Sequence, residues 1–255
     1  MTSSPDRLAL VTGTSAGIGA AVAHRLLERG WIVVGVSRRE AAVDHANYTH
    51  AVVDLGDQTN AVTSIDRMVM PLIADPRFRR IGLVNNAAVG GQLGPIEKLQ
   101  PAALLAMYAV NVVAPIRLMG LVVERSHADA SLRIVNVSSG AAVRAVPGLG
   151  AYAGSKAALR MAGMVLAAEL DSPLRPGVPR PDAAIVSYEP GAVETAMQAN
   201  ARSLSREEFP WVEMFHRFQS SGVLVAPEGP AAEIAALLES DALPRFCERR
   251  HGQLV

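Results

Sequence analysis

The stretch LALVTGTSAGIGAAV, residues 8–22, contains the pattern that decides the fold. Its short apolar beginning, residues 8–13, is typical of a buried β-strand. The glycines that follow allow a tight turn, and residues 17–29 are predicted to form a helix. This order of strand, glycine turn and helix predicts the first βα unit of a parallel sheet.

The glycines of this turn, Gly13, Gly17 and Gly19, have a G-x-x-x-G-x-G spacing. They permit close approach of the backbone to a pyrophosphate, and the helix N-terminus offers free N–H groups and a favourable dipole. Turns are rich in glycine, so the triplet alone is a weak signal. Its place between strand and helix favours a variant of the dinucleotide-binding fingerprint, which has a different spacing.

The same alternation continues along the chain. Short runs that are apolar on both faces indicate strands buried in a parallel sheet, and the longer patterns between them indicate helices. Further strands are expected at 31–37, 50–55, 81–87, 132–139 and 183–191, and helices at 59–73, 101–125 and 150–170. The sequence therefore predicts an α/β fold with one Rossmann domain over residues 1–255. Its doubly wound, mostly parallel sheet would have about seven strands, with helices on both faces.

Composition and charge exclude several other classes of protein. The 255 residues carry 24 basic and 24 acidic side chains, which argues against a general nucleic-acid binder. One cysteine, Cys247, cannot form an internal disulfide, and the N-terminus does not resemble a signal peptide, so a cytoplasmic protein is expected. Residues 102–123 have nearly the length and apolarity of a membrane span. They include Asn111, Pro115 and Arg117, which favours a buried helix over a membrane helix.

A tyrosine and a lysine stand four residues apart in AYAGSKAAL, residues 151–159. On a helix, Tyr152 and Lys156 would share one face. Lowering the pKa of a phenol from about 10 by roughly 3 units takes about 4 kcal/mol, and one positive charge about 4 Å away supplies about that much. The pair is therefore a candidate acid/base. A surface tyrosine beside a solvated lysine is the alternative.

Four motifs together resemble the short-chain dehydrogenase/reductase family. They are T-G-x-x-x-G-x-G at 12–19, NNAA at 85–88, a serine ahead of Y-x-x-x-K, and P-G-x-x-x-T at 190–195. Each motif is weak alone, but all four in this order are specific, and the resemblance runs from about residue 7 to at least 200. Ala88 departs from the glycine that the family usually has, which raises the question of a shifted backbone there.

The resemblance implies a role for each catalytic position. Tyr152 would donate a proton to a substrate carbonyl, and Lys156 would lower the tyrosine pKa and bind the nicotinamide ribose. Ser139 would hold the carbonyl oxygen, because the family's serine commonly lies thirteen residues before the tyrosine; its neighbour Ser138 is then structural. Asn111 would complete a proton relay through water, and a buried amide satisfied by backbone is the alternative.

The resemblance also implies a cofactor site at the carboxyl edge of the sheet. Asp54 would contact adenine, Asn85 would lie near the adenine ribose, and Val193 and Thr195 would hold the carboxamide. The full set of expected cofactor contacts, with Tyr152 and Lys156, is Gly13, Ser15, Gly17, Ile18, Gly19, Ser37, Arg38, Asp54, Leu55, Asn85, Ala87, Pro190, Gly191, Val193 and Thr195.

The end of the second strand, VVGVSRRE, favours NADP over NAD. An acidic residue there would favour NAD, whereas an arginine pairs with the 2′-phosphate of NADP. Ser37 and Arg38 occupy this place, and Glu40 comes later and is expected to point away. Arg38 is the expected phosphate partner, with Ser37 as a further donor. Two solvated surface arginines are the alternative.

The C-terminal third resembles sepiapterin reductases and bacterial benzil reductases, through a P-G-x-x-x-T-x-M-Q segment. The expected function is NADPH-dependent reduction of a ketone or diketone. A 3-oxoacyl thioester, polyol or steroid dehydrogenase of the same family is the alternative enzyme, and a dinucleotide-sensing regulator is the alternative outside catalysis. Residues 195–225 are expected to form a mobile segment over the substrate cleft.

The partner of such an enzyme would be a small carbonyl compound, with no nucleic acid, membrane or metal. The six histidines are scattered without ligand spacing. A homodimer or homotetramer is expected, because helices 101–125 and 151–170 carry more apolar residues than one sheet face requires, among them Leu118, Leu121, Val122, Leu159 and Met164.

Overall fold

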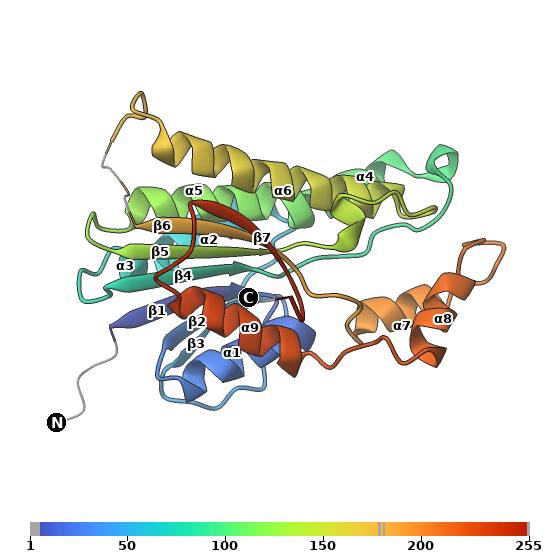
Figure 1. The fold of residues 1–255 in the computed structure, drawn as a ribbon, viewed down its shortest axis with the longest axis horizontal. Helices are drawn as coiled ribbons and strands as arrows, with labels where there is room; N and C mark the ends of the chain where they lie inside the picture. Colours follow the sequence, from blue (N-terminus) through green and yellow to red (C-terminus); the bar gives the residue numbers. More distant parts are fainter. Residues whose placement is uncertain (1–5, 178–179, 181, 254–255) are drawn as a thin grey trace.

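A parallel sheet of seven strands forms the centre of the molecule (Figure 1). The computed structural model describes residues 6–177, 180 and 182–253. The strands lie in the order β3-β2-β1-β4-β5-β6-β7, and all neighbouring pairs are parallel. Their bounds are β1 Arg7–Thr12, β2 Ile32–Ser37, β3 Tyr48–Val52, β4 Arg80–Asn85, β5 Ser131–Val137, β6 Ala183–Glu189 and β7 Phe246–Arg250. The expected doubly wound α/β fold is confirmed.

Helices cover both faces of this sheet (Figure 1). One apolar core lies between the strands and α1 with α9, and a second lies between the strands and α2, α3, α5 and α6. The α-helical bounds are α1 Gly17–Glu28, α2 Gln58–Met68, α3 Met70–Ile73, α4 Pro101–Tyr108, α5 Ala114–Arg125, α6 Gly150–Asp171, α7 Ala196–Arg202, α8 Glu213–Ser220 and α9 Glu228–Glu239.

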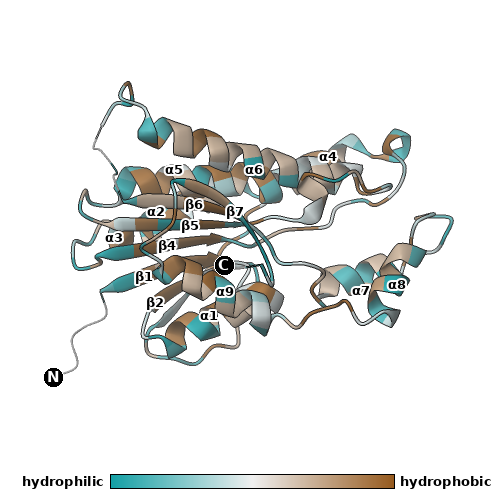
Figure 2. Cartoon of the chain, viewed as in Figure 1, coloured by the Kyte–Doolittle hydropathy of each residue, from teal (hydrophilic) through white to brown (hydrophobic). Residues whose placement is uncertain are grey.

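The central strands are apolar on both sides because both sides are buried. In β1, Leu8 and Leu10 point into the core under α5 and α6, while Ala9 and Val11 point into the core under α1 and α9. All four side chains are fully buried. Figure 2 shows the resulting hydrophobic sheet between its two helical layers.

Two predicted elements have different bounds in the structure. The third strand, expected at 50–55, is β3 at Tyr48–Val52, because it pairs with β2 only as far as Ser37 and the chain then leaves the sheet. The helix expected at 59–73 is divided at Val69 into α2 and α3. Pro71, in the first turn of α3, has no N–H for a continuous helix.

The long helix expected at 101–125 is one helical stretch with a wide turn inside it. α4 leads through a π-helical turn, Ala109–Val113, into α5. Pro115 explains the wide turn, because its ring displaces the carbonyl of residue 111 from the α-helical ladder. Pro101–Arg125 is long and apolar enough to cross a membrane, since its most apolar 18-residue window has a mean hydropathy of 1.7. However, 56% of this window is buried inside the fold, as in the core helix of a globular protein.

Four of the five apolar residues expected to face a second subunit face the core instead. Leu118, Leu121, Val122 and Leu159 are at most 6% exposed and pack in the core under α5 and α6. Their apolarity is therefore used within one chain. The large apolar side chains that are exposed on the helical stretches 101–125 and 151–170 are Leu105, Val113, Ile116, Met161 and Val165.

The segment at 195–225 contains two short helices, α7 and α8, which project beyond the carboxyl end of the sheet (Figure 1). They enclose a small apolar cluster of their own that includes Phe209, Val212 and Phe215. A backbone bridge between Val193 and Val225 ties the two ends of the segment together. The connection expected at 171–182 includes residues 178, 179 and 181, which lie outside the described residues.

Candidate active site

A cleft of about 1340 Å³ opens at the carboxyl end of the sheet, around the ends of β1 and β4. In doubly wound sheets this crevice, where the strand order reverses, is the usual ligand site. Sixteen of the residues predicted for the site line it, namely Gly13, Ser15, Gly17, Ile18, Ser37, Arg38, Asp54, Leu55, Ala87, Ser139, Tyr152, Lys156, Pro190, Gly191, Val193 and Thr195. Gly19, Asn85 and Asn111 do not.

The glycine turn after β1 requires glycine for steric reasons. Gly13 has a φ of 78°, and a Cβ there would lie 2.7 Å from Nδ2 of Asn86. A Cβ on Gly19 would lie 2.3 Å from the carbonyl oxygen of Gly13, so this glycine allows α1 to pack closely behind the turn. Gly17 has a φ of 59° and faces the cleft, where the nearest atom to such a Cβ is Cγ2 of Thr195 at 3.4 Å. The turn therefore exposes backbone at the start of α1, which fits a pyrophosphate.

Asn86, and not Asn85, joins the glycine turn to the end of β4. Its Nδ2 donates to the carbonyl oxygen of Thr12 at 2.9 Å, and its backbone N–H donates to Oγ1 of Thr12 at 3.0 Å. Asn85 points into the protein, where its Nδ2 donates to Oδ1 of Asn136 on β5 at 2.8 Å. The expectation for Asn85 is corrected: adjacent residues at the end of a strand face opposite sides, and the other asparagine lines the cleft.

The end of β2 presents two basic side chains to the cleft. Arg38 and Arg39 are exposed, and neither has an ion-pair partner among the described residues. The Ser37 hydroxyl is buried and donates to the carbonyl oxygen of Arg39 at 2.6 Å, which fixes the turn that carries Arg38. Asp54, after β3, accepts at Oδ1 from the N–H of Gly56. This end of the cleft is positively charged and suits an anionic group.

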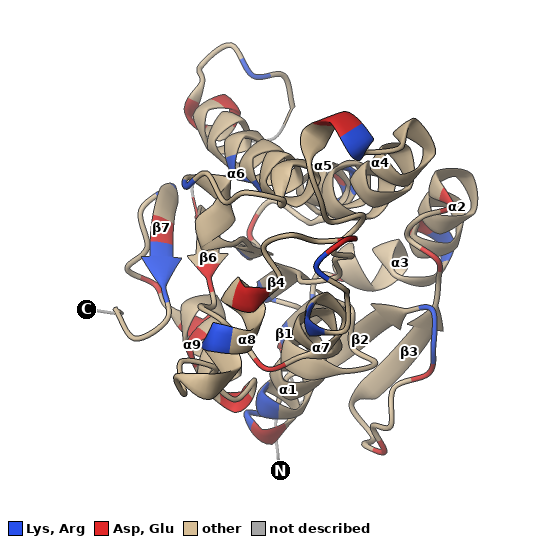
Figure 3. Ribbon diagram, turned by 90° about the vertical axis from the view of Figure 1, so that its right-hand side faces the viewer, with Lys and Arg blue, Asp and Glu red and all other residues tan. Residues whose placement is uncertain are grey.

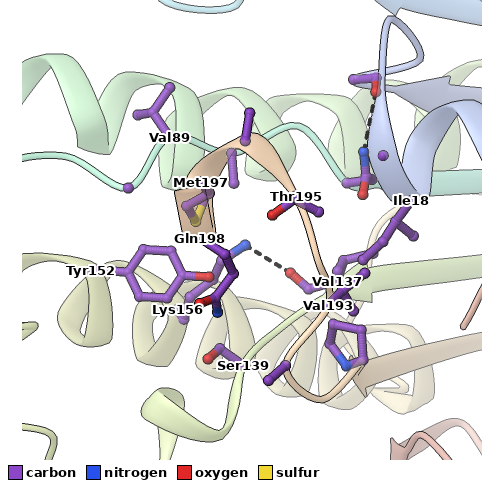
Figure 4. A pocket seen from close by; sticks show the side chains of 18 of the residues that line it. Ile18, Val89, Val137, Ser139, Tyr152, Lys156, Val193, Thr195, Met197 and Gln198 are labelled. Carbon is purple, nitrogen blue, oxygen red and sulfur yellow. Dashed lines mark hydrogen bonds between the residues drawn. The ribbon is translucent and has the colours of Figure 1, made fainter. Parts of the chain in front are cut away.

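Ser139, Tyr152 and Lys156 meet at the other end of the cleft (Figure 4). Ser139 follows β5, and its hydroxyl faces the same part of the cleft as that of Tyr152, near the start of α6. Lys156, one turn later on α6, is buried and donates from Nζ to the carbonyl oxygen of Val137 at 2.8 Å. Nζ lies 5.8 Å from the centroid of the Tyr152 ring. The spacing of Y-x-x-x-K therefore does place both groups on one face.

The pKa of Tyr152 differs from the expectation. Burial raises the pKa of this phenol above its usual value of 10.0, and the nearby Ser139 hydroxyl offsets only part of that increase. Burial also lowers the pKa of Lys156 from 10.5 to about 8. The lysine charge is directed at the carbonyl of Val137 and does not overcome the desolvation of the phenol. Tyr152 is therefore protonated at neutral pH, which is the state that a proton donor needs.

We expect the reductive kcat/KM to fall as pH rises through about 8, because Lys156 then loses its charge. A single essential ionisation gives a decrease of about tenfold per pH unit above that point. The measurement is a kcat/KM profile with NADPH and a ketone from pH 6 to 10. Lys156→Arg, whose side chain stays charged, is expected to lose the break near pH 8 even if its rate is lower. A wild-type profile that is flat from pH 7 to 9.5 would contradict the assignment.

Asn111 holds the loop that forms the opposite wall of the cleft. It lies in the π-helical turn, is buried, and binds both backbone groups of Val89: Nδ2 donates to the carbonyl oxygen at 2.9 Å, and Oδ1 accepts from the N–H at 2.9 Å. Nδ2 also donates to Oγ of Ser155 at 3.2 Å. The amide is thus satisfied within the fold, as the alternative interpretation had it, and a part in a water relay stays a prediction.

The substrate pocket is expected near residues 89–96, 140–150 and 188–215, but the sequence does not show which of their side chains enter it. Met197 and Gln198 come from α7 and enter the cleft (Figure 4), and Phe215 and Phe218 come from α8. Glu189 at the end of β6 accepts from Arg144 at 2.7 Å, and Arg250 of β7 lies 3.5 Å from the same oxygen. Figure 3 shows the acidic end of β6 and the basic end of β7 beside each other. Only the order E-P-G, which places a carboxylate directly after β6, hinted at this cluster.

Ala88 replaces the usual glycine without distorting the backbone. No described residue other than glycine has a positive φ, so Ala88 is accommodated without backbone strain.

Among residues 6–177, 180 and 182–253, no group of three or more histidine, cysteine, aspartate or glutamate side chains could hold a metal ion.

Comparison with known proteins agrees with this geometry. The family model of the short chain dehydrogenases matches residues 7–205. A benzil reductase ((S)-benzoin forming) of Bacillus cereus is 31% identical over 250 residues, covering 94% of this chain and 96% of the relative. A sepiapterin reductase of Meriones unguiculatus is 28% identical over 250 residues and covers 91% of each chain.

A crystal structure of the KRED1-Pglu enzyme superposes with a TM-score of 0.77 at 25% identity, covering 94% of this chain and all of that one. The four sequence motifs, with Ala88 in place of the usual glycine, all lie within the matched residues 7–205. The chain belongs to the short-chain dehydrogenase family and is an oxidoreductase that acts on CH–OH and C=O groups.

Proposed function

We propose that this protein is an NADPH-dependent carbonyl reductase for ketones or diketones with bulky apolar substituents, similar to benzil and sepiapterin reductases. One observation carries the proposal. A single cleft has the hydroxyls of Ser139 and Tyr152 beside Lys156 at one end and the unpaired Arg38 at the other. The first end suits a carbonyl, and the second suits a nucleotide phosphate.

Each catalytic side chain has a defined task at the substrate carbonyl. The Ser139 hydroxyl donates a hydrogen bond to the carbonyl oxygen, and the Tyr152 phenol gives that oxygen its proton as negative charge develops. NADPH, when bound, supplies the hydride. The charged Lys156 stabilises the phenolate that remains, and the cleft walls from Val89 and Val193 keep water away from the carbonyl carbon.

The residues of the cleft fit a nicotinamide dinucleotide. The backbone at Gly13 and Gly17 accepts the pyrophosphate, and Asp54 and Leu55 lie where an adenine would be bound. Cγ2 of Thr195 lies 3.4 Å from the position of a Cβ on Gly17, so Thr195 is close enough to the glycine turn to bind the carboxamide. The exposed Arg38 and Arg39 and the absence of an acid at the end of β2 favour the 2′-phosphate of NADP.

An apolar compartment supports a bulky substrate. Beyond the catalytic cluster, the cleft is lined by Leu149, Leu204, Met214, Phe215 and Phe218. These side chains come from the loop before α6 and from the segment with α7 and α8. Burying aryl rings among them is favourable at roughly 25 cal/mol per Å² of apolar surface, whereas the hydroxyls of a polyol would find few partners there.

The test is a screen of NADPH oxidation against benzil, sepiapterin, a 3-oxoacyl thioester and L-xylulose. We expect the highest kcat/KM with the aryl diketone. A preference for the thioester or the sugar would replace the proposal with the alternative enzyme of the same family. A protein that binds NADPH and reduces none of the four would support the dinucleotide-sensing alternative.

We also propose that the protein forms a homodimer or homotetramer through α5 and α6. Val113 and Ile116 at the start of α5 and Met161 and Val165 on α6 are each at least 41% exposed. We expect light scattering at micromolar concentration to give two or four times the 26.9 kDa of one chain. The double variant Met161→Glu, Val165→Glu should reduce that mass. A wild-type mass of one chain would refute the proposal.

The cytoplasm is the compartment that we propose for this reaction. The single cysteine of the protein, Cys247, is a free thiol buried in β7, which suits a reducing environment. Cell fractionation with an antibody to the native chain tests this, and recovery of the protein in the membrane fraction would contradict it.

A further inference from the structure

Gln198 places an unsatisfied amide oxygen at the catalytic end of the cleft. Its Oε1 is inaccessible to solvent and has no hydrogen-bond partner among the described residues. Figure 4 shows the side chain entering the cleft from α7, between Tyr152 and Val137 and toward Lys156 and Ser139. Because solvent does not reach Oε1, the amide nitrogen Nε2, which is not among the buried unpaired atoms, is the polar end of Gln198 that a ligand in the cleft can reach.

The main chain fixes the direction of this side chain. The N–H of Glu194 donates to the carbonyl oxygen of Val225 at 3.1 Å, and the N–H of Val225 donates to that of Ala192 at 2.9 Å. One turn before Gln198, Cγ2 of Thr195 lies 3.4 Å from the position of a Cβ on Gly17, and Met197 lies 3.4 Å from the position of a Cβ on Gly90. Contacts on both sides of the cleft therefore position the start of α7.

We propose that Gln198 binds the oxygen on the carbon next to the reacting carbonyl, so that the enzyme selects vicinal diketones and 2-hydroxy ketones over simple ketones. The inference rests on the proposed reductase function. Ser139 and Tyr152 occupy the reacting oxygen, and an amide beside them offers two N–H donors and one acceptor. Nε2 donates to this second oxygen, whether it belongs to a carbonyl or to the hydroxyl of a 2-hydroxy ketone.

This contact gives selectivity against ketones that lack the second oxygen. A site that is built to hydrogen-bond a substrate oxygen discriminates against an analogue without it, because the analogue displaces water from the Nε2 group and leaves its N–H unpaired. The apolar compartment alone gives no such selectivity, since it contacts the substituents of both kinds of ketone in the same way. Gln198 is thus assigned as a specificity-determining residue.

The experiment compares benzil with deoxybenzoin, which keeps both phenyl rings and replaces one carbonyl by a methylene group. For Gln198→Leu we expect kcat/KM to fall about tenfold to a hundredfold on benzil and to change by less than about twofold on deoxybenzoin. The KM for NADPH should not change. Gln198→Met, which keeps the unbranched length, should behave in the same way, and Gln219→Leu on the exposed face of α8 is the matched control.

Four outcomes would overturn the inference. An equal loss on both ketones would mean that Gln198 acts on the reacting carbonyl or on the fold. A higher KM for NADPH with an unchanged ratio of the two ketones would mean that it binds the cofactor. A wild-type enzyme that reduces neither ketone would refute the proposed function as well, whereas an unchanged ratio in an active Gln198→Leu enzyme would refute this inference alone.

Discussion

Replacing Tyr152 by phenylalanine is expected to lower kcat for ketone reduction by about 10²- to 10⁴-fold, the usual contribution of an acid–base group. The variant keeps the ring and its packing and loses only the hydroxyl that faces the cleft beside Ser139. Because the pKa of this phenol is raised by burial, the wild-type group carries its proton at neutral pH, and nothing else in the cluster replaces it. The measurement is single-turnover reduction at saturating NADPH.

The fold and cofactor affinity should not change in this variant. We expect the Kd for NADPH and the melting temperature to stay close to wild type. Tyr108→Phe is the matched control, because Tyr108 also packs against α6, beside Gly154, but does not line the cleft. A Tyr152→Phe enzyme that keeps more than about a tenth of the wild-type rate would show that another group donates the proton.

Replacing Arg38 by alanine is expected to lower the ratio of kcat/KM for NADPH to that for NADH by about tenfold to a hundredfold. A charge-assisted contact with a phosphate contributes about 1.5–3 kcal/mol, which corresponds to that range. Arg38 has no ion-pair partner among the described residues, so its guanidinium is available for a phosphate. The effect should come from NADPH, with little change for NADH.

Arg39→Ala is the control for this experiment, since it removes the same charge one residue later. We expect it to change the ratio by less than about threefold. If both variants lose the preference equally, the effect is one of general charge near the cleft and not of one contact. A wild-type enzyme that prefers NADH would overturn the assignment of NADP.

The fold could be predicted from the sequence because its signals are local and repeat along the chain. Each strand of the sheet centre is a short apolar run, and the glycine turn stands directly between β1 and α1. The boundaries were less predictable where tertiary pairing decides them. β3 ends at Val52 because its partner β2 ends, and the following residues are as apolar as those within the strand.

The site could be predicted only as far as its motifs reach. The resemblance to a family identified Ser139, Tyr152 and Lys156, but motif position does not determine which way a side chain points. For this reason Asn85 was expected at the cleft, whereas Asn86 lines it. The pKa of Tyr152 was expected to be low because spacing reveals a nearby charge but not the desolvation that opposes it. Gln198 lies on a helix that was not predicted.

The pairing of Asn111 with both backbone groups of Val89 has a consequence for variation among related sequences. The amide of Asn111 pairs with both the N–H and the C=O of Val89, as a neighbouring strand pairs with a residue of a sheet. The long helix thereby holds the cleft wall at Val89. The position beside this anchor can exchange its side chain, as with Ala88 in place of glycine, whereas Gly91, with a φ of 68°, cannot, and a change at Asn111 would release the wall at Val89.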